Sequence, residues 1–170
     1  LLIRGPTDGV LIPTPRYPLY SALLDLLGGA SADYYLDEES GWQLSRRELE
    51  RAYEDGKKRG LEIRALVVVN PGNPTGQVMS ASSLRDTVDF CRAKNLVLIA
   101  DEVYQENVWR DGAKFVSFKR VVAEMGAAKD IQLASLHSVS KGFFGECGRR
   151  GGFVELSGFS RDVRDLMYKM

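Results

Sequence analysis

The chain contains one histidine and two cysteines among its 170 residues. Cys91 and Cys147 share no metal-binding or redox spacing, which argues against a structural zinc site and against a disulfide framework. The formal net charge is zero, because 23 lysine and arginine residues balance 23 aspartate and glutamate residues. A neutral chain has no overall field to attract nucleic acid or an anionic membrane surface. The apolar runs are too short to span a bilayer, so we expect neither kind of partner.

Apolar segments alternate with amphipathic ones along the whole chain. Hydrophobic residues make up 44% and charged residues 27%, a composition that supports a sizeable core. The length suits one domain, and no internal repeat or low-complexity linker divides it. Strands are predicted at residues 10–13, 32–36, 61–69, 96–100, 131–136 and 152–156, and helices at 17–27, 45–59, 84–94, 118–125 and 160–170. This alternation predicts an α/β fold whose sheet is mostly parallel.

Three polar residues lie just beyond three consecutive predicted strands: Asn73, Asp101 and Lys141. Open α/β sheets bind ligands outside the carboxyl ends of their strands, so we expect the three to converge on one ligand. A lysine, an acid and an amide suit pyridoxal phosphate, because the lysine can form a Schiff base while the acid pairs with the pyridinium nitrogen. The pattern predicts a pyridoxal-phosphate site at this edge of the sheet.

Each residue of this site also has a plainer interpretation. Asn73 belongs to a tight loop of turn formers, Asp101 could cap a following helix, and Lys141 could be a solvated surface lysine. For a lysine in a tight, partly desolvated site we expect a lowered pKa, which favours a role as nucleophile and base. Tyr104 could donate to the same phenolic oxygen as Asn73. Tyr17 could either stack on the cofactor ring or pack as a core aromatic.

Phosphate ligands are predicted around the same lysine. Ser138 and the backbone of the turn that follows it could bind a phosphate group. The run GRRGG at residues 148–152 adds Arg149 and Arg150, and a guanidinium is a natural bidentate partner of phosphate. A solvated basic turn is the alternative interpretation of this run.

Three motifs in this order resemble the class I and II aminotransferases of fold type I: NPGNPTG at residues 70–76, ADEVYQ at residues 100–105 and SVSKG at residues 138–142. The likeness covers nearly the whole chain. Two further stretches, YLDEE at residues 35–39 and GECG at residues 145–148, resemble the alanine aminotransferase branch. The resemblance implies a three-layer αβα fold, the large domain of an aspartate aminotransferase-like enzyme. It also implies that this domain is incomplete, without its N-terminal segment and without the C-terminal small domain.

The resemblance also implies roles for individual residues. Lys141 would carry the cofactor as a Schiff base and shuttle the Cα proton, while Asp101 would hold the pyridinium nitrogen. The family pattern Gly-x-Arg-x-Gly selects Arg150, whereas counting from the lysine in relatives with a shorter loop selects Arg149; we prefer Arg150. No metal is implied. The implied cofactor contacts are Tyr17, Asn73, Asp101, Tyr104, Ser138, Lys141 and Arg150.

The reaction implied by the resemblance moves an amino group between L-alanine and 2-oxoglutarate, giving pyruvate and L-glutamate. Small amino acids and 2-oxo acids would be the substrates, and the full-length protein would be a homodimer. The upstream phosphate-binding loop, and the small domain with its arginine for the substrate carboxylate, would lie outside residues 1–170. We therefore expect this fragment alone to be inactive. No targeting segment is present, which leaves the cytosol and the mitochondrion both open.

Other functions fit the same motifs. Glutamate–glyoxylate, aspartate and aromatic aminotransferases and aminocyclopropane-carboxylate synthases share the scaffold. An aminotransferase-like effector domain of a transcription regulator would also bind the cofactor, but it requires a helix-turn-helix that these residues do not include. A cofactor-free paralogue is a third alternative, and the joint presence of Asn73, Asp101, Tyr104 and Lys141 argues against it.

Overall fold

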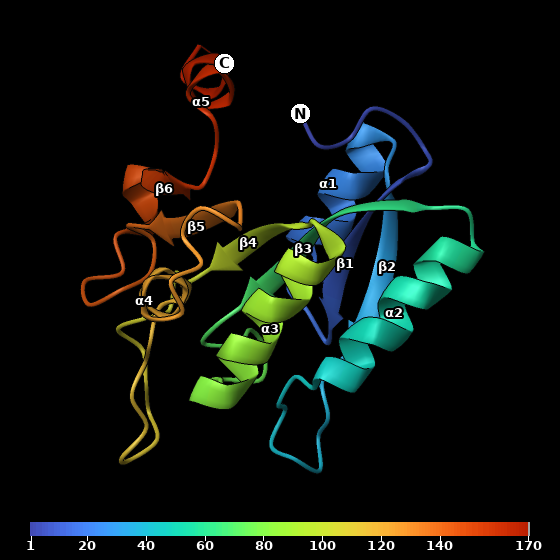
Figure 1. The fold of residues 1–170 in the computed structure, drawn as a ribbon. Helices are drawn as coiled ribbons and strands as arrows, with labels where there is room; N and C mark the ends of the chain where they lie inside the picture. Colours follow the sequence, from blue (N-terminus) through green and yellow to red (C-terminus); the bar gives the residue numbers. More distant parts are fainter. Residues whose placement is uncertain (170) are drawn as a thin grey trace.

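The computed structural model describes residues 1–169, and Met170 lies outside the described part. One six-stranded sheet carries helices on both faces, which confirms the expected α/β class and its three layers (Figure 1). The elements are β1 (Asp8–Thr14), α1 (Leu19–Leu27), β2 (Ala30–Tyr35), α2 (Arg46–Lys58), β3 (Glu62–Val69), α3 (Ala81–Lys94), β4 (Val97–Asp101), α4 (Phe118–Glu124), β5 (Leu133–Ser138), the 3₁₀ turn η1 (Cys147–Arg149), β6 (Gly152–Ser157) and α5 (Arg161–Met167).

The strands are ordered β2-β1-β3-β4-β5-β6 across the sheet. The first five run parallel to one another, and β6 pairs antiparallel with β5. The expectation of a mostly parallel sheet is therefore confirmed. The chain places β2 on one side of β1 and then continues on the other side with β3, so the strand order reverses between β1 and β3. Such a switch point opens a crevice at the carboxyl ends of the strands, where ligands bind.

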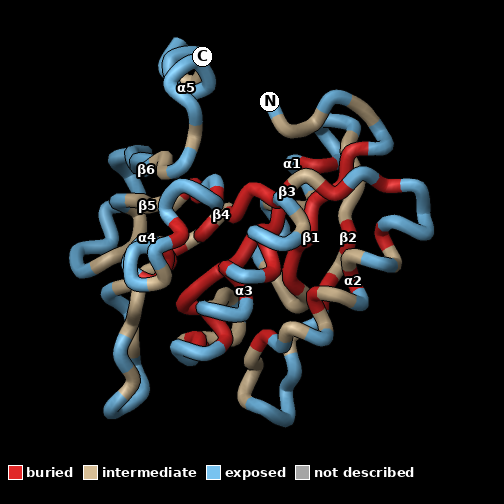
Figure 2. Tube along the Cα trace, viewed as in Figure 1, coloured by how far each residue is buried: buried red, intermediate tan, exposed pale blue. Residues whose placement is uncertain are grey.

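The central strands are apolar on both faces because helices cover both sides of the sheet. In β3, Leu66 and Val68 face the larger core cluster, which includes residues of α2, α3 and α4. Val67 and Val69 face a smaller cluster on the opposite side, where α1 contributes Leu24. Burial on both sides of the sheet explains why residues 65–69 form a continuous apolar run. Figure 2 shows the buried residues gathered in β1, β3, β4 and the inner side of α3.

The last strand and the last helix are the most exposed elements (Figure 2). A glycine at the start of β6 allows the strand to approach β5, because a Cβ atom on Gly152 would lie 2.4 Å from the carbonyl oxygen of His137. The helix predicted at residues 160–170 is α5, which ends earlier, at Met167. No helix within residues 1–169 is long and apolar enough to cross a membrane.

The helix predicted from residue 17 begins two residues later than expected. Pro18 occupies the N-cap position with a φ angle of −62°, and proline suits a helix start because it has no N–H to leave unpaired. Tyr17 therefore stays in the β1–α1 loop, while Tyr20 lies in the first turn of α1. This boundary decides where the two tyrosine side chains lie relative to the sheet edge.

Candidate functional site

The three polar residues selected from the sequence lie beside the carboxyl ends of neighbouring strands. Asp101 is the last residue of β4 and pairs in register with Val69 of β3 and Leu136 of β5. Asn73 lies in the loop after β3, and Lys141 lies in the turn after β5. The structure thus brings the three together at one edge of the sheet. Their roles toward a cofactor stay predictions.

Asn73 and Tyr104 form the first direct contact within the site. The Asn73 amide nitrogen donates to the Tyr104 hydroxyl over 3.3 Å. The Lys141 Nζ lies 5.2 Å from the centre of the Tyr104 ring. A cavity of about 250 Å³ opens here and is lined by Pro71, Gly72, Asn73, Pro74, Gly76, Tyr104 and Asn107. The amide and the phenol therefore line one small-molecule-sized space, and the lysine amine lies near the ring of the same phenol.

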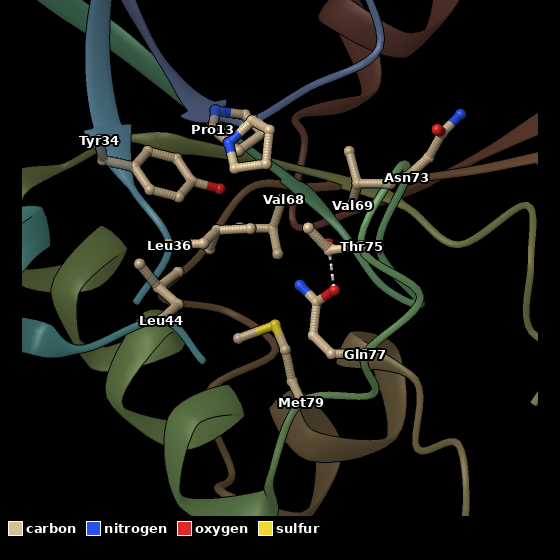
Figure 3. Close-up of a pocket in the computed structure, with 12 residues that line it drawn as sticks. Pro13, Tyr34, Leu36, Leu44, Val68, Val69, Asn73, Thr75, Gln77 and Met79 are labelled. Atoms are coloured by element: carbon tan, nitrogen blue, oxygen red, sulfur yellow. Dashed lines mark hydrogen bonds between the residues drawn. The ribbon is translucent and has the colours of Figure 1, made fainter. Parts of the chain in front are cut away.

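The loop after β3 is held by its own hydrogen bonds. The backbone N–H of Gly72 donates to the Gln77 carbonyl over 2.9 Å, and the Thr75 hydroxyl donates to the Gln77 side chain. Figure 3 shows the Asn73 amide pointing away from the apolar cavity beneath this loop, in which Tyr34 is one of the lining residues. The loop thus packs one side into the core and presents Asn73 on the other.

The expected lowering of the Lys141 pKa is wrong in this structure. A hydrogen bond with the Tyr104 hydroxyl raises the pKa of Lys141, with smaller contributions in the same direction from Cys147 and Tyr17. Desolvation, the cause invoked from the sequence, is the weaker effect here because the amine is not enclosed by the described residues. The free amine is therefore protonated at neutral pH.

Asp101 is held by a residue that the sequence did not single out. The Tyr20 hydroxyl of α1 donates to Asp101 Oδ2 over 2.5 Å, and the Val103 backbone N–H donates to Oδ1 over 3.4 Å. Burial raises the pKa of the Tyr20 phenol, and the neighbouring Asp101 carboxylate raises it further. The phenol is therefore a permanent donor. A hydroxyl on the apolar side of a predicted helix was the only signal in the sequence.

The candidate phosphate ligands form one connected turn after β5. Ser138 Oγ accepts from the Ser140 backbone N–H over 3.1 Å, and Arg150 donates to Ser140 Oγ over 3.4 Å and to the Cys147 carbonyl over 2.8 Å. Arg149 instead forms an exposed ion pair with Glu146 at 3.0 Å. The two adjacent arginines therefore differ, since only Arg150 is directed into the turn that carries Ser138 and Lys141.

Tyr17 is not the core aromatic that the plainer interpretation assigned. Its side chain is 52% exposed, and its phenol contributes to the raised pKa of Lys141. Tyr17 thus lies on the open side of the site, beside the lysine. The predicted stacking on a cofactor ring needs an aromatic face in such a position, and the role itself stays a prediction.

Three contacts from the segment after β4 connect the parts of the site, and none of them was predicted. Trp109 donates from its indole nitrogen to the Gly76 carbonyl over 3.1 Å. Asn107 donates to the Gly142 carbonyl over 3.5 Å, and Gln105 shares a hydrogen bond of 3.2 Å with His137. The segment therefore touches both the Asn73 loop and the Lys141 turn. Contacts between loops depend on the tertiary fold and leave no periodic signal in a sequence.

Glu102, next to Asp101 in the sequence, binds the backbone at the start of α4. Its carboxylate is buried and accepts from the Phe118 backbone N–H over 2.7 Å, at the start of α4. Burial raises the pKa of Glu102 to about 7, against the lowering effect of that hydrogen bond. The two consecutive acids therefore differ in role: Glu102 binds the start of a helix, while Asp101 lies at the carboxyl end of β4.

The combined groups suit one kind of ligand. An amine can condense with a carbonyl group, a carboxylate can pair with a protonated ring nitrogen, and an amide and a phenol can bind a ring oxygen. Serine and arginine side chains can hold a phosphate. No group of three or more histidine, cysteine, aspartate or glutamate side chains within residues 1–169 is arranged to hold a metal ion.

The sheet order and the helices on both faces define a domain with the aspartate aminotransferase fold. An aspartate aminotransferase from Thermus thermophilus superposes with a TM-score of 0.73 at 22% identity, over 90% of this chain and 36% of that one. The chain belongs to the class I and II aminotransferases, because the family model described as "Aminotransferase class I and II" matches residues 1–170.

Relatives within the family carry related names. Alanine aminotransferase 1, mitochondrial, from Arabidopsis thaliana is 56% identical over the whole of this chain and 32% of its own length. Glutamate–glyoxylate aminotransferase 1 from Arabidopsis thaliana is 46% identical over 99% of this chain and 36% of its own length. The chain therefore spans about a third of the length of the relatives that it matches.

Proposed function

We propose that these residues form the cofactor-binding part of a pyridoxal-phosphate-dependent aminotransferase. The complete enzyme converts L-alanine and 2-oxoglutarate into pyruvate and L-glutamate. The observation that carries this proposal is the convergence of Lys141, Asp101, Asn73 and Tyr104 at one edge of the sheet. The 56% identity to an alanine aminotransferase supports the choice of substrate.

The proposal includes the parts of the enzyme that residues 1–170 do not supply. This chain is part of the large domain, and the rest of the protein provides a further phosphate-binding loop and a small domain that binds the substrate carboxylate. The complete enzyme is a homodimer that takes amino acids and 2-oxo acids. Its location is mitochondrial or cytosolic, and the mitochondrial name of the Arabidopsis relative supports the first.

The described residues fit pyridoxal phosphate group by group. Asp101 would hold the ring nitrogen, Asn73 and Tyr104 would hold the ring oxygen, and Tyr17 would pack against the ring. When bound, the cofactor supplies an aldehyde that condenses with amines and a protonated ring that withdraws electrons from the substrate Cα. The fit rests on the chemistry of the side chains, because the amine, carboxylate, amide and phenol that the cofactor needs all lie at the carboxyl ends of neighbouring strands.

Lys141 moves the proton in the proposed reaction. With the cofactor bound and the substrate amine in its place, Lys141 would take the proton from the substrate Cα and hand it to the carbon that carried the cofactor's aldehyde. The neighbouring Tyr104 hydroxyl orients the amine through its hydrogen bond, and that same bond raises the Lys141 pKa. Because the Lys141 amine is not enclosed by the described residues, it can move between the two positions that a proton shuttle requires.

The two adjacent arginines allow a matched test of the phosphate site. We expect Arg150→Ala in the complete enzyme to weaken pyridoxal-phosphate binding by about 10- to 100-fold, because a charge-assisted hydrogen bond to phosphate is lost. Arg149→Ala removes only a surface ion pair with Glu146, so we expect less than about a twofold change. Dissociation constants from absorbance titrations measure both, and a larger loss in Arg149→Ala would assign the phosphate to that residue.

Substrate turnover tests the reaction itself. We expect the complete enzyme to use L-alanine with 2-oxoglutarate at a kcat/KM at least about 100-fold above that for L-aspartate or L-tyrosine, because the substrate side-chain pocket discriminates by size and charge. Coupled assays of pyruvate formation measure this. Faster turnover of L-glutamate with glyoxylate would favour the alternative carried by the 46% identical relative. Absence of any transamination by the cofactor-loaded protein would overturn the proposal.

A further inference from the structure

The shorter of the two hydrogen bonds to the Asp101 carboxylate comes from helix α1. Tyr20 donates its phenolic proton to Asp101 Oδ2 over 2.5 Å. A hydrogen bond to a carboxylate is shorter and about twice as strong as one between neutral groups. Among residues 1–169, the one hydrogen bond to the remaining oxygen, Oδ1, comes from the Val103 backbone N–H, at 3.4 Å. One oxygen is thus firmly held, while the other keeps lone pairs for a further donor.

The position of the Tyr20 hydroxyl is fixed by the packing of its ring. The ring lies against the smaller core cluster, together with Ile99 of β4 and Leu24 of α1. Ile99 precedes Asp101 on the same strand, so the aromatic ring and the carboxylate are both fixed relative to β4. Burial and the neighbouring carboxylate raise the pKa of the phenol, and it therefore donates throughout the pH range in which enzymes work.

We propose that Tyr20 is a positioning residue that fixes Asp101 Oδ2, so that the other carboxylate oxygen is aimed at the cofactor's ring nitrogen and holds the proton there. This inference rests on the proposed function, because it gives Asp101 the ring nitrogen as its second partner. Without the phenol, the Asp101 carboxylate can turn, its contact with the ring nitrogen weakens, and the ring nitrogen loses its proton more readily. The ring then withdraws electrons less strongly.

A purely structural role for Tyr20 would have different consequences. Tyr34 provides the matched control, because its buried hydroxyl also bonds to a residue distant in the sequence, donating to the Val67 carbonyl over 2.9 Å. Replacing either tyrosine by phenylalanine keeps the ring and removes one buried hydrogen bond. Both variants lose thermal stability, and only Tyr20→Phe removes a donor from Asp101. A change shared by the two variants therefore reports packing, whereas a change confined to Tyr20→Phe reports the carboxylate.

The test uses the complete enzyme loaded with ¹⁵N-labelled pyridoxal phosphate. We expect the ring-nitrogen resonance of Tyr20→Phe to move toward the value of an unprotonated pyridine, and that of Tyr34→Phe to match the wild type. We also expect kcat of Tyr20→Phe to fall about tenfold with KM changed less than about twofold, since one charge-assisted hydrogen bond is lost. An unmoved ring-nitrogen resonance in Tyr20→Phe would overturn the proposal.

A measurement without cofactor separates this inference from the proposed function. In the cofactor-free protein, the Tyr20 proton should give a resonance far downfield of the amide region, present in Tyr34→Phe and absent from Tyr20→Phe. Its absence from the wild type would overturn the Tyr20–Asp101 contact, even if Tyr20→Phe failed to fold. A wild type that shows this proton but binds no pyridoxal phosphate would refute the proposed function and, with it, the role of Tyr20 toward the ring.

Discussion

Replacing Lys141 by alanine is expected to abolish transamination, lowering kcat by at least about 10⁴-fold, because one amine serves both as attachment point and as proton carrier. The fold should be unaffected. Lys141 lies in a turn, its amine lies 5.2 Å from the centre of the Tyr104 ring, and surface changes of this kind alter stability by no more than about 0.5 kcal/mol. Turnover assays and thermal unfolding of the complete enzyme measure the two quantities.

Chemical labelling shows whether the lost activity belongs to this amine. After addition of pyridoxal phosphate and reduction with borohydride, mass spectrometry of the wild type should find a single phosphopyridoxyl group, attached to Lys141. The control is Lys129→Ala, which changes an exposed lysine before β5 and should keep full activity and the Lys141 label. Transamination by Lys141→Ala, or labelling spread over many lysines, would contradict the assignment.

The second large effect is expected at Asp101. We expect Asp101→Ala to slow Cα proton abstraction about 10³-fold, because an electrostatic partner of the reacting system is worth about 10² to 10³ in rate. Stability should fall by about 1–3 kcal/mol, since the Tyr20 hydroxyl keeps its place and loses its acceptor. The loss in rate corresponds to about 4 kcal/mol, so catalysis suffers more than folding does.

Asparagine separates charge from packing at this position. Asp101→Asn keeps an oxygen that can accept from Tyr20, so we expect nearly wild-type thermal stability but a loss in rate close to that of alanine. A primary isotope effect with α-deuterated L-alanine reports whether proton abstraction has become the slow step. An Asp101→Asn enzyme that reacts at the wild-type rate would remove the pyridinium role from this residue.

Periodicity predicted most of the fold because burial leaves a local pattern. Residues 65–69 are apolar throughout since helices cover both faces of β3, and the predicted strand differs from the observed one only at Leu61. The direction of β6 was a different matter, because an antiparallel edge strand and a parallel one have the same composition. The structure shows that β6 runs antiparallel to β5. The two strands pair closely at Gly152, where a Cβ atom would meet the His137 carbonyl oxygen.

The residues of the site also fall into two groups, those that the sequence predicted and those that only the structure showed. Asn73, Asp101 and Lys141 could be selected from the sequence because each follows an apolar run, and strand ends in a parallel sheet lie together. Tyr20 could not, since its meaning depends on where α1 packs and on which atom its hydroxyl reaches. The same holds for Trp109 and Asn107, whose partners lie in loops distant in the sequence.

The sequence by itself determined the fold class, the family and the order of the functional groups, because these follow from residue type and spacing along the chain. Only the tertiary structure decided the state of those groups. It showed that Lys141 has a raised pKa rather than a lowered one, and that Arg150 rather than Arg149 turns toward Ser140. The physical reason is that a pKa or a side-chain direction depends on distances between atoms that folding alone brings together.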